Sequence, residues 1–105
     1  MLSIVVPTFL EAENIPQLIA GIFDSLNETS ISYEVIIVDD NSPDGIKNVV
    51  DQLVADYPVR LMQPKGRERD LSMSVIEGTR AAHGNHILVM DADLSHPPGF
   101  IPAMY

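Results

Sequence analysis

Two aspartates spaced by a single residue follow an apolar run near the end of this 105-residue chain. The run is Ile87-Leu88-Val89-Met90, and Asp91-Ala92-Asp93 comes directly after it. Four apolar residues in a row predict a buried strand, and in an extended chain residues i and i+2 lie on one side, roughly 6.5–7 Å apart. Asp91 and Asp93 would then share one divalent cation, Mg²⁺ or Mn²⁺, which binds carboxylate oxygens, waters and substrate phosphates. The alternative is a solvated turn, because Asp-x-Asp is a common tripeptide.

Short apolar runs alternate with amphipathic stripes along the rest of the chain. The runs predict four strands, at residues 2–6, 35–38, 59–62 and 86–90. The stripes predict three helices, over residues 15–26, 46–57 and 71–82. Because strands and helices alternate without hairpin signals, we expect an α/β fold, a parallel Rossmann-like sheet flanked by helices in the order βαβαβαβ.

Local signals indicate where these elements end. Pro7 is expected to stop the first strand, since it cannot donate a backbone hydrogen bond. Asn14 is the expected N-cap of the first helix, in which Pro16 is tolerated because it falls in the first turn. Asp44 and Gly45 are expected to form a turn and the cap of the second helix.

Carboxylates follow three of the four predicted strands. Glu11 comes after the first strand, Asp39 and Asp40 end the second, and the Asp91/Asp93 pair follows the fourth. Ligands of open parallel sheets bind outside the carboxyl ends of the strands, so these side chains are expected to converge on one cleft. For Asp40 the sequence favours bracing of the following turn over contact with a ligand.

Composition excludes several classes of protein. The net charge is −9, and no basic patch of the kind that binds nucleic acid is present. The chain has no cysteine, so disulfides and thiol catalysis are excluded. No apolar run reaches the roughly 20 residues that span a bilayer. We expect a cytoplasmic location, at most at the cytoplasmic face of a membrane, with any membrane contact made by segments beyond Tyr105.

Three known phosphate-binding designs do not fit the sequence. A dinucleotide-binding domain needs a glycine-rich turn after its first strand, and here that turn has no glycine. The Gly-Lys-Ser/Thr of a P-loop is absent, and a phospho-aspartyl hydrolase would carry Asp-x-Asp after its first strand rather than its fourth. What remains is a site that holds a diphosphate through a metal ion.

Motifs along the whole chain resemble those of family 2 glycosyltransferases of the GT-A fold. They are Val5-Val6-Pro7-Thr8-Phe9, Glu11-Ala12-Glu13-Asn14, Val38-Asp39-Asp40-Asn41-Ser42-Pro43-Asp44-Gly45 and Met90-Asp91-Ala92-Asp93-Leu94-Ser95-His96-Pro97-Pro98. Within that family they are most similar to dolichol-phosphate mannose synthases. The chain departs from the family pattern at Phe9-Leu10, which replaces Tyr-Asn, and at residues 69–74, which replace a glycine-rich segment.

The resemblance implies roles for individual residues. The residues implied to line the nucleotide-sugar pocket are Pro7, Phe9, Glu11, Ile37, Asp39, Asp91, Ala92 and Asp93. Among them, Ile37 and Asp39 would lie beside the base and ribose. Asp91 and Asp93 would be the catalytic and metal-binding pair, with Asp93 the principal ligand of Mg²⁺ or Mn²⁺.

The implied activity is metal-dependent transfer of mannose from GDP-mannose to a polyprenyl or dolichyl phosphate with inversion. The alternatives are another family 2 enzyme that uses UDP-glucose or a different nucleotide sugar, and a non-catalytic nucleotide-binding, metal-binding or receiver-like module. Residues 100–105 look like the start of a further helix. We therefore expect residues 1–105 to be the nucleotide-sugar-binding part of a glycosyltransferase domain truncated at its C-terminus, poorly active alone.

Overall fold

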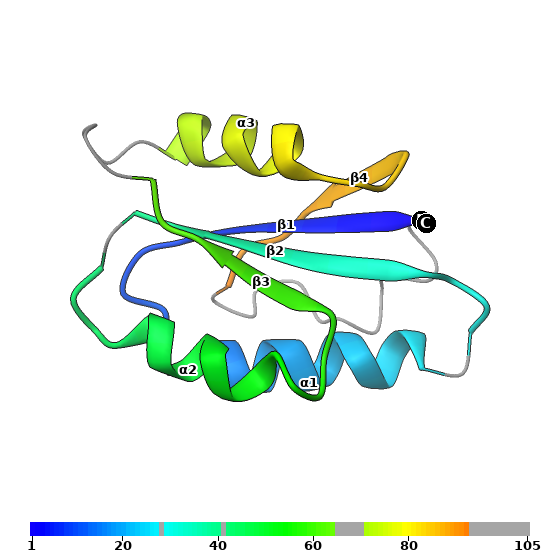
Figure 1. Cartoon of the computed structure of the whole chain (residues 1–105), viewed down its shortest axis with the longest axis horizontal. Helices are drawn as coiled ribbons and strands as arrows, with labels where there is room; N and C mark the ends of the chain where they lie inside the picture. The colour runs from blue at the N-terminus through cyan, green and yellow to red at the C-terminus, as the bar shows by residue number, and fades with distance from the viewer. Residues whose placement is uncertain (28, 41, 65–70, 93–105) are drawn as a thin grey trace.

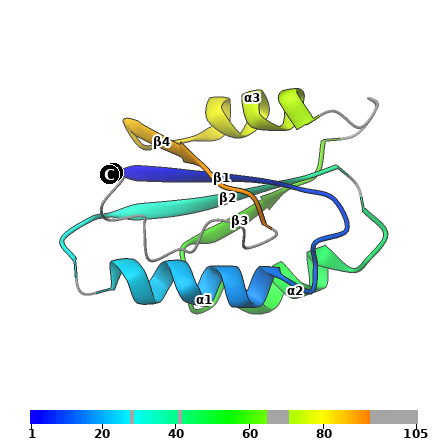
Figure 2. The same cartoon turned by 180° about the vertical axis from the view of Figure 1, so that it is seen from behind.

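A computed structural model describes residues 1–27, 29–40, 42–64 and 71–92. The elements are β1 (Leu2–Thr8), α1 (Ile15–Leu26), β2 (Tyr33–Asp39), α2 (Ile46–Leu53), β3 (Val59–Met62), α3 (Leu71–Ala81) and β4 (His86–Val89). The strands form one parallel sheet in the order β3-β2-β1-β4. Helices α1 and α2 cover one face of this sheet and α3 lies over the other (Figure 1; Figure 2 shows the reverse view). The predicted α/β fold is confirmed.

The sheet register brings the carboxyl ends of β1 and β2 to the same level. The seven residues of β1 pair one to one with the seven of β2, from Leu2 beside Tyr33 to Thr8 beside Asp39. Because β1 lies between β2 and β4, the loops that leave all three strands emerge side by side at this edge. The order of the strands therefore assembles the candidate site.

The prediction that Pro7 stops the first strand is wrong, because β1 continues to Thr8. The even-numbered residues of β1 direct their backbone hydrogen bonds toward β2. On that side Leu2 N–H donates to Ser32 O, and Thr8 O accepts from Asp40 N–H. Pro7 has the opposite parity and faces the β4 side, beyond the last pair, Val5 with Val89. Proline is tolerated there because no strand partner requires its missing N–H.

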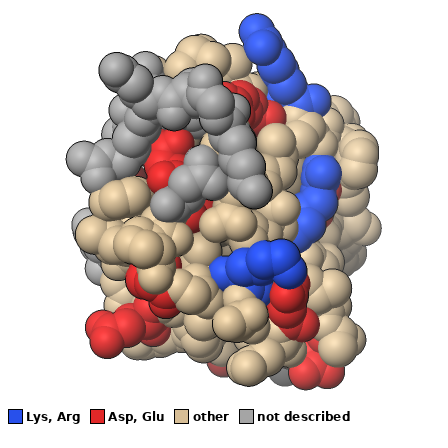
Figure 3. Space-filling model, turned by 60° about the vertical axis from the view of Figure 1, so that its left-hand side comes forward, with Lys and Arg blue, Asp and Glu red and all other residues tan. Residues whose placement is uncertain are grey.

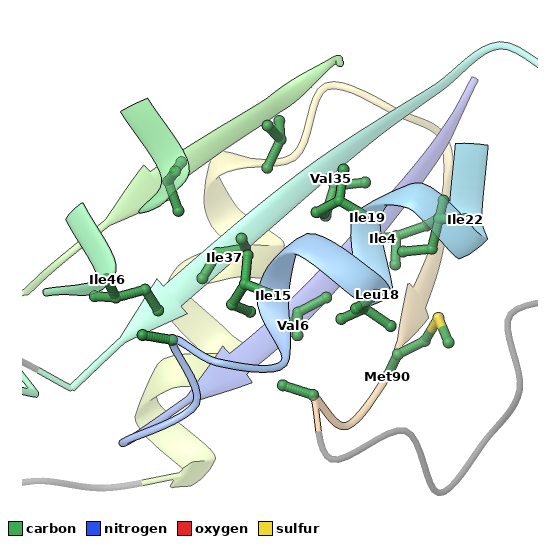
Figure 4. Packing of buried hydrophobic residues seen from close by; sticks show 14 of the residues in the cluster. Ile4, Val6, Ile15, Leu18, Ile19, Ile22, Val35, Ile37, Ile46 and Met90 are labelled. Carbon is green, nitrogen blue, oxygen red and sulfur yellow. The ribbon is translucent and has the colours of Figure 1, made fainter. Parts of the chain in front are cut away.

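One face of the sheet carries most of the hydrophobic core. Figure 4 shows Ile15, Leu18, Ile19 and Ile22 of α1 packed over the sheet. Ile4, Val6, Val35 and Ile37 form the strand side of this cluster and are at most 1% exposed. Each such side chain contributes roughly 1.5–3 kcal/mol when it is fully buried. The apolar side chains that recur every 3.6 residues in α1 thus pack in one layer against the apolar side chains of the strands.

Two predicted helix features differ in the structure. Asn14 makes no side-chain cap to α1, and its amide instead donates to Glu11 Oε2 at 2.7 Å. Helix α2 ends at Leu53, so Val54 is 51% exposed and Tyr57 lies outside the helix. The ring of Tyr57 packs edge-on against Phe23 of α1 at 5.3 Å, which explains its apolar spacing in the sequence.

Strand β4 is less buried than its apolar sequence predicts. Ile87 and Val89 are 43% and 45% exposed, while Met90 is 2% exposed. Helix α3 packs against β1 and β2, and β4 is the outer strand of the sheet in the described part of the chain. The prediction of a fully buried fourth strand is therefore wrong. Within the described residues, no helix has the length and apolar character needed to cross a bilayer.

Candidate functional site at the carboxyl edge of the sheet

The loop between β1 and α1 makes a sharp turn at Leu10. This residue adopts φ +59°, in the left-handed region that non-glycine residues rarely occupy, and its side chain is 56% exposed. Phe9 before it and Glu11 after it are half-buried. Glu11 is held by two bonds from Asn14, one from its backbone N–H to Glu11 O and one from its side-chain amide to Glu11 Oε2. The turn thus fixes the two predicted pocket residues on either side of an exposed apolar side chain.

Asp39 lies fully buried at the end of β2, beneath the loops. Its Oδ1 accepts hydrogen bonds from Thr8 Oγ1 and Ser42 Oγ, both at 2.8 Å. Its Oδ2 accepts from Ser42 N–H at 2.8 Å and from Gln63 Nε2 at 3.2 Å. These four contacts match the roughly four lone-pair sites of a carboxylate. Asp39 is 0% exposed, so in this conformation its oxygens are occupied by the protein itself.

Asp44 joins the loop after β1 to the loop after β2. Its Oδ2 accepts from Ala12 N–H at 3.0 Å, and its Oδ1 lies 2.9 Å from Ser42 Oγ. Burial alone would raise the pKa of Asp44. The hydrogen bonds from Ala12 N–H and Ser42 Oγ outweigh burial and hold this pKa below its ordinary value. Since Ser42 has one hydroxyl proton, Asp39 and Asp44 share it.

Sequence reasoning missed three residues of this network: Thr8, Ser42 and Gln63. One signal was present in the sequence. Ser42 lies three residues after Asp39, the spacing at which an aspartate accepts from a following backbone N–H. The position of Thr8 directly beside Asp39 comes from the sheet register, which the structure shows. Gln63 follows β3, the one strand to which no site residue was assigned, and only the fold reveals its contact with Asp39.

The end of β4 brings Asp91 to the same edge. Met90 N–H donates to Val5 O at 3.0 Å, which fixes the chain as it leaves the strand beside β1. Asp91 is exposed, whereas Ala92 is 3% exposed and lies in a turn. The extended backbone predicted for the pair ends at Val89, two residues before Asp91. Asp93, the predicted principal metal ligand, lies outside the described residues.

The described residues are compatible with a hard cation but do not form a complete cage. Among them, no group of three or more His, Cys, Asp or Glu side chains could hold a metal ion. The exposed carboxylate of Asp91 supplies oxygen ligands, the type that Mg²⁺ and Mn²⁺ take together with waters and substrate phosphates. Figure 3 shows acidic side chains on this side of the molecule together with Lys and Arg side chains. The fit to the predicted metal therefore rests on the oxygen donors of Asp91 and not on the overall charge of this face.

Three other predicted pocket residues are buried in the fold. Ile37 is 0% exposed and lies in the core cluster with Ile15 of α1. Pro7 is buried within β1, and Ala92 belongs to the same core cluster as Ile37. The structure thus places Phe9, Glu11 and Asp91 with partly or fully exposed side chains at one edge, and Asp39 beneath them. Ligand contacts by all of these residues stay predictions.

A separate shallow pocket lies at the opposite end of the sheet. It has a volume of about 380 Å³ and is lined by Glu34, Val54, Tyr57, Pro58, Val59, Arg60 and His83. Glu34 and Arg60 lie near the amino ends of β2 and β3, so this pocket is remote from the carboxyl edge. Its polar residues tie the end of α3 to the sheet, because Arg60 Nη2 donates to Ala81 O and Glu34 accepts from His83 N–H.

Sequence comparisons identify relatives of this chain. Over 102 residues the chain is 39% identical to a dolichol-phosphate mannosyltransferase of Pyrococcus furiosus, covering 97% of this chain and 28% of the relative. It is also 39% identical over 105 residues to the dolichol-phosphate mannosyltransferase of Saccharomyces cerevisiae, covering 98% of this chain and 39% of the relative. The chain therefore spans well under half the length of either relative.

Solved structures share the same fold. A mannosyltransferase of Pyrobaculum calidifontis, solved in complex with GDP-Man and Mn²⁺, superposes with a TM-score of 0.74 and 25% identity over 88% of this chain and 27% of that one. The S. aureus protein TarS, at 23% identity and a TM-score of 0.67 over 88% of this chain and 16% of its own, shows the fold alone. Residues 3–105 match the family described as Glycosyl transferase family 2. The chain belongs to this family of glycosyltransferases.

Proposed function

We propose that this chain is the nucleotide-sugar-binding part of a glycosyltransferase that moves mannose from GDP-mannose to a polyprenyl or dolichyl phosphate. The observation that carries the proposal is the 39% identity, over 97% of the chain, to a protein named dolichol-phosphate mannosyltransferase. The structure supports it by gathering Phe9, Glu11 and Asp91 at the carboxyl edge of the sheet. Residues 1–105 would then act as the donor-binding part of a larger catalytic unit.

In the proposed reaction the acceptor phosphate attacks the anomeric carbon of the sugar from the face opposite the diphosphate, with inversion. A divalent cation, Mg²⁺ or Mn²⁺, would supply a Lewis acid for the charge that develops on the departing diphosphate. Asp91 and Asp93 are the residues proposed to hold it. A phosphate acceptor is already anionic near pH 7, so no general base is required of the chain.

The protein side chains contribute positioning in this proposal. Phe9 and Glu11 flank the turn at Leu10 and would line the side of the nucleotide. The bond between Asp44 and Ala12 holds that loop against the one after β2, so the two walls of the pocket keep a fixed separation. Fixed walls lower the entropic cost of orienting the donor.

The proposal is tested by titrating the chain with GDP-mannose and with UDP-glucose, each with diamagnetic Mg²⁺ and with excess chelator, in ¹H–¹⁵N NMR spectra. We expect saturable shifts in the residues after β1, β2 and β4 with GDP-mannose and Mg²⁺. Binding should weaken by about tenfold or more with chelator or in Asp93→Ala. Asp51→Ala, on the exposed face of α2, is the matched control.

Each alternative function predicts a different result in this titration. Equal or tighter binding of UDP-glucose would favour another family 2 enzyme. Binding that is indifferent to metal and to Asp93→Ala would remove the metal assignment. Absence of binding to either nucleotide sugar would overturn the proposed function of this chain.

A further inference from the structure

The contact between Gln63 and Asp39 is the least secure of the four that occupy this buried carboxylate. Its length is 3.2 Å, against 2.8 Å for each of the other three. Thr8 and Ser42, which supply those three, are themselves 6% and 9% exposed. Gln63 is half-buried and reaches Asp39 from the end of β3 through a flexible side chain. Of the donors in the described chain, Gln63 is the one that can withdraw without opening the fold.

While Gln63 is in place, Oδ2 of the Asp39 carboxylate has no spare acceptor site for a ligand, because it already receives Ser42 N–H and the Gln63 amide. Its Oδ1 receives the Thr8 hydroxyl and shares the Ser42 hydroxyl proton with Asp44. An ionised carboxylate only accepts hydrogen bonds, so a group that replaces the amide must be an N–H or O–H donor. Nucleobase edges provide such groups, and guanine presents adjacent N1–H and N2–H donors.

We propose that the Gln63 side-chain amide occupies, in the unliganded protein, the oxygen of Asp39 that a guanine N–H takes when the donor nucleotide binds. This inference rests on the proposed function. It makes Gln63 a specificity-determining residue that competes with the base for Asp39. The free energy that a ligand gains at Asp39 is therefore only the difference between that of its own hydrogen bond and that of the bond that Gln63 gives up. The nucleotide must therefore offer a well-placed N–H donor, and a base without one leaves Gln63 where it is.

The proposal predicts that removing the amide increases affinity. In Gln63→Met the side chain keeps a similar length and loses its donor, which leaves Oδ2 with one free acceptor site in the free protein. A hydrogen bond of ordinary net strength then no longer has to be broken on binding. The dissociation constant for GDP in the presence of Mg²⁺ should fall roughly threefold to tenfold. Gln52→Met, the same change on the exposed face of α2, should have no effect.

The experiment measures the dissociation constant of GDP with Mg²⁺ by NMR titration for the wild type, Gln63→Met, Gln63→Ala and Gln52→Met. It also follows the side-chain amide signals of Gln63 and Gln52 in the wild type. We expect tighter binding in both Gln63 variants and a shift of the Gln63 amide signal alone on addition of GDP. Thermal unfolding of each variant checks that it is folded. If Gln63→Met does not fold, the comparison is made with Gln63→Ala.

The outcomes separate the inference from the proposed function. A wild type that does not bind GDP overturns the proposed function and this inference with it. A wild type that binds GDP, with unchanged affinity in both Gln63 variants, overturns only the inference, because Asp39 Oδ2 then takes no part in binding. Weaker binding in these variants also overturns it, because Gln63 would then contact the nucleotide directly.

Discussion

Asp44 Oδ2 accepts a hydrogen bond from the backbone N–H of Ala12 at 3.0 Å, across 32 positions of sequence. The bond connects the loop after β1, which carries Phe9 and Glu11, to the loop after β2. Ala12 is 7% exposed, so its N–H has little access to water as an alternative partner. The Asp44 carboxylate therefore helps to hold the two loops together at the carboxyl edge, beside the bonds that Thr8 makes with Asp39 and Asp40.

Replacing Asp44 by alanine should weaken both the fold and donor binding. It leaves the buried N–H of Ala12 without its acceptor, so we expect a loss of about 1–3 kcal/mol in unfolding free energy. Affinity for GDP-mannose with Mg²⁺ should fall severalfold, because the loop that carries Phe9 and Glu11 is released. Asp44→Asn keeps an oxygen that can accept from Ala12 N–H. The affinity of this variant should therefore lie between those of wild type and Asp44→Ala.

The control for this prediction is Asp51→Ala, which removes an exposed carboxylate paired with Lys47. It should change neither affinity nor stability measurably. Chemical denaturation and NMR titration of the same samples give both quantities. A loss of stability in Asp44→Ala with unchanged affinity would show that the bond serves the fold alone.

Leu10 should be a point of stored strain in the loop after β1. A left-handed backbone costs an L-residue roughly 1–2 kcal/mol, and glycine adopts it without that cost. Leu10→Gly should therefore be more stable than Leu10→Ala by about 1 kcal/mol in urea unfolding, since both variants lack the exposed side chain and differ at φ +59°. The reverse order of stability would contradict a left-handed backbone at this position.

The layers of this fold follow from patterns that are local in sequence. The stripe in residues 15–26 and the apolar runs of β1 and β2 each indicate their own element, and their alternation indicates a parallel sheet. The exposure of Ile87 and Val89 could not be predicted in the same way. It depends on α3 lying over β1 and β2 rather than β4, which is a property of the packing.

The candidate site was predictable in its location and less so in its contacts. Carboxylates after successive parallel strands must share an edge, and the structure puts Glu11, Asp39 and Asp91 there. The sequence favoured Asp40 as the brace of the turn after β2, which stays a prediction, and it did not indicate that Asp39 accepts from Ser42. Neighbouring residues of an extended strand point to opposite faces, so a shift of one position exchanges a buried side chain for an exposed one. Because both residues are aspartates, the side-chain type does not indicate which of them points inward.

Gly78 should be required for the close approach of α3 to the sheet. A Cβ built at this position would lie 2.5 Å from Val5 Cγ1 and 2.9 Å from Val38 Cγ2. Gly78→Ala should destabilise the protein by about 1–3 kcal/mol through overpacking, although alanine favours a helix by up to about 1 kcal/mol. Thr79→Ala, on the exposed face of the same helix, is the control for helix propensity. A Gly78→Ala variant as stable as wild type would mean that α3 does not pack this closely.

Glu34 should contribute to stability in a pH-dependent manner at the amino end of the sheet. Burial would raise the pKa of this carboxyl, but hydrogen bonds from Ser3 Oγ and His83 N–H, both 2.6 Å, and the charge of Arg60 lower it overall. Because the folded pKa lies below the unfolded value of about 4.3, the stabilisation is present above that value and is lost as pH falls through the folded pKa.

Glu34→Gln should therefore cost about 1–2 kcal/mol at pH 7, and the difference from wild type should shrink below about pH 4. Urea unfolding of both proteins at a series of pH values measures this difference directly. Comparing the two proteins at each pH removes the contribution of Asp44, whose pKa is also lowered. Glu13→Gln, an exposed carboxylate, should show no such trend. If the loss of unfolding free energy in Glu34→Gln stayed constant from pH 7 to pH 3, the substitution would act through altered packing or hydrogen-bond geometry and not through the lost charge. The ionised carboxylate would then not be what ties α3 to the sheet.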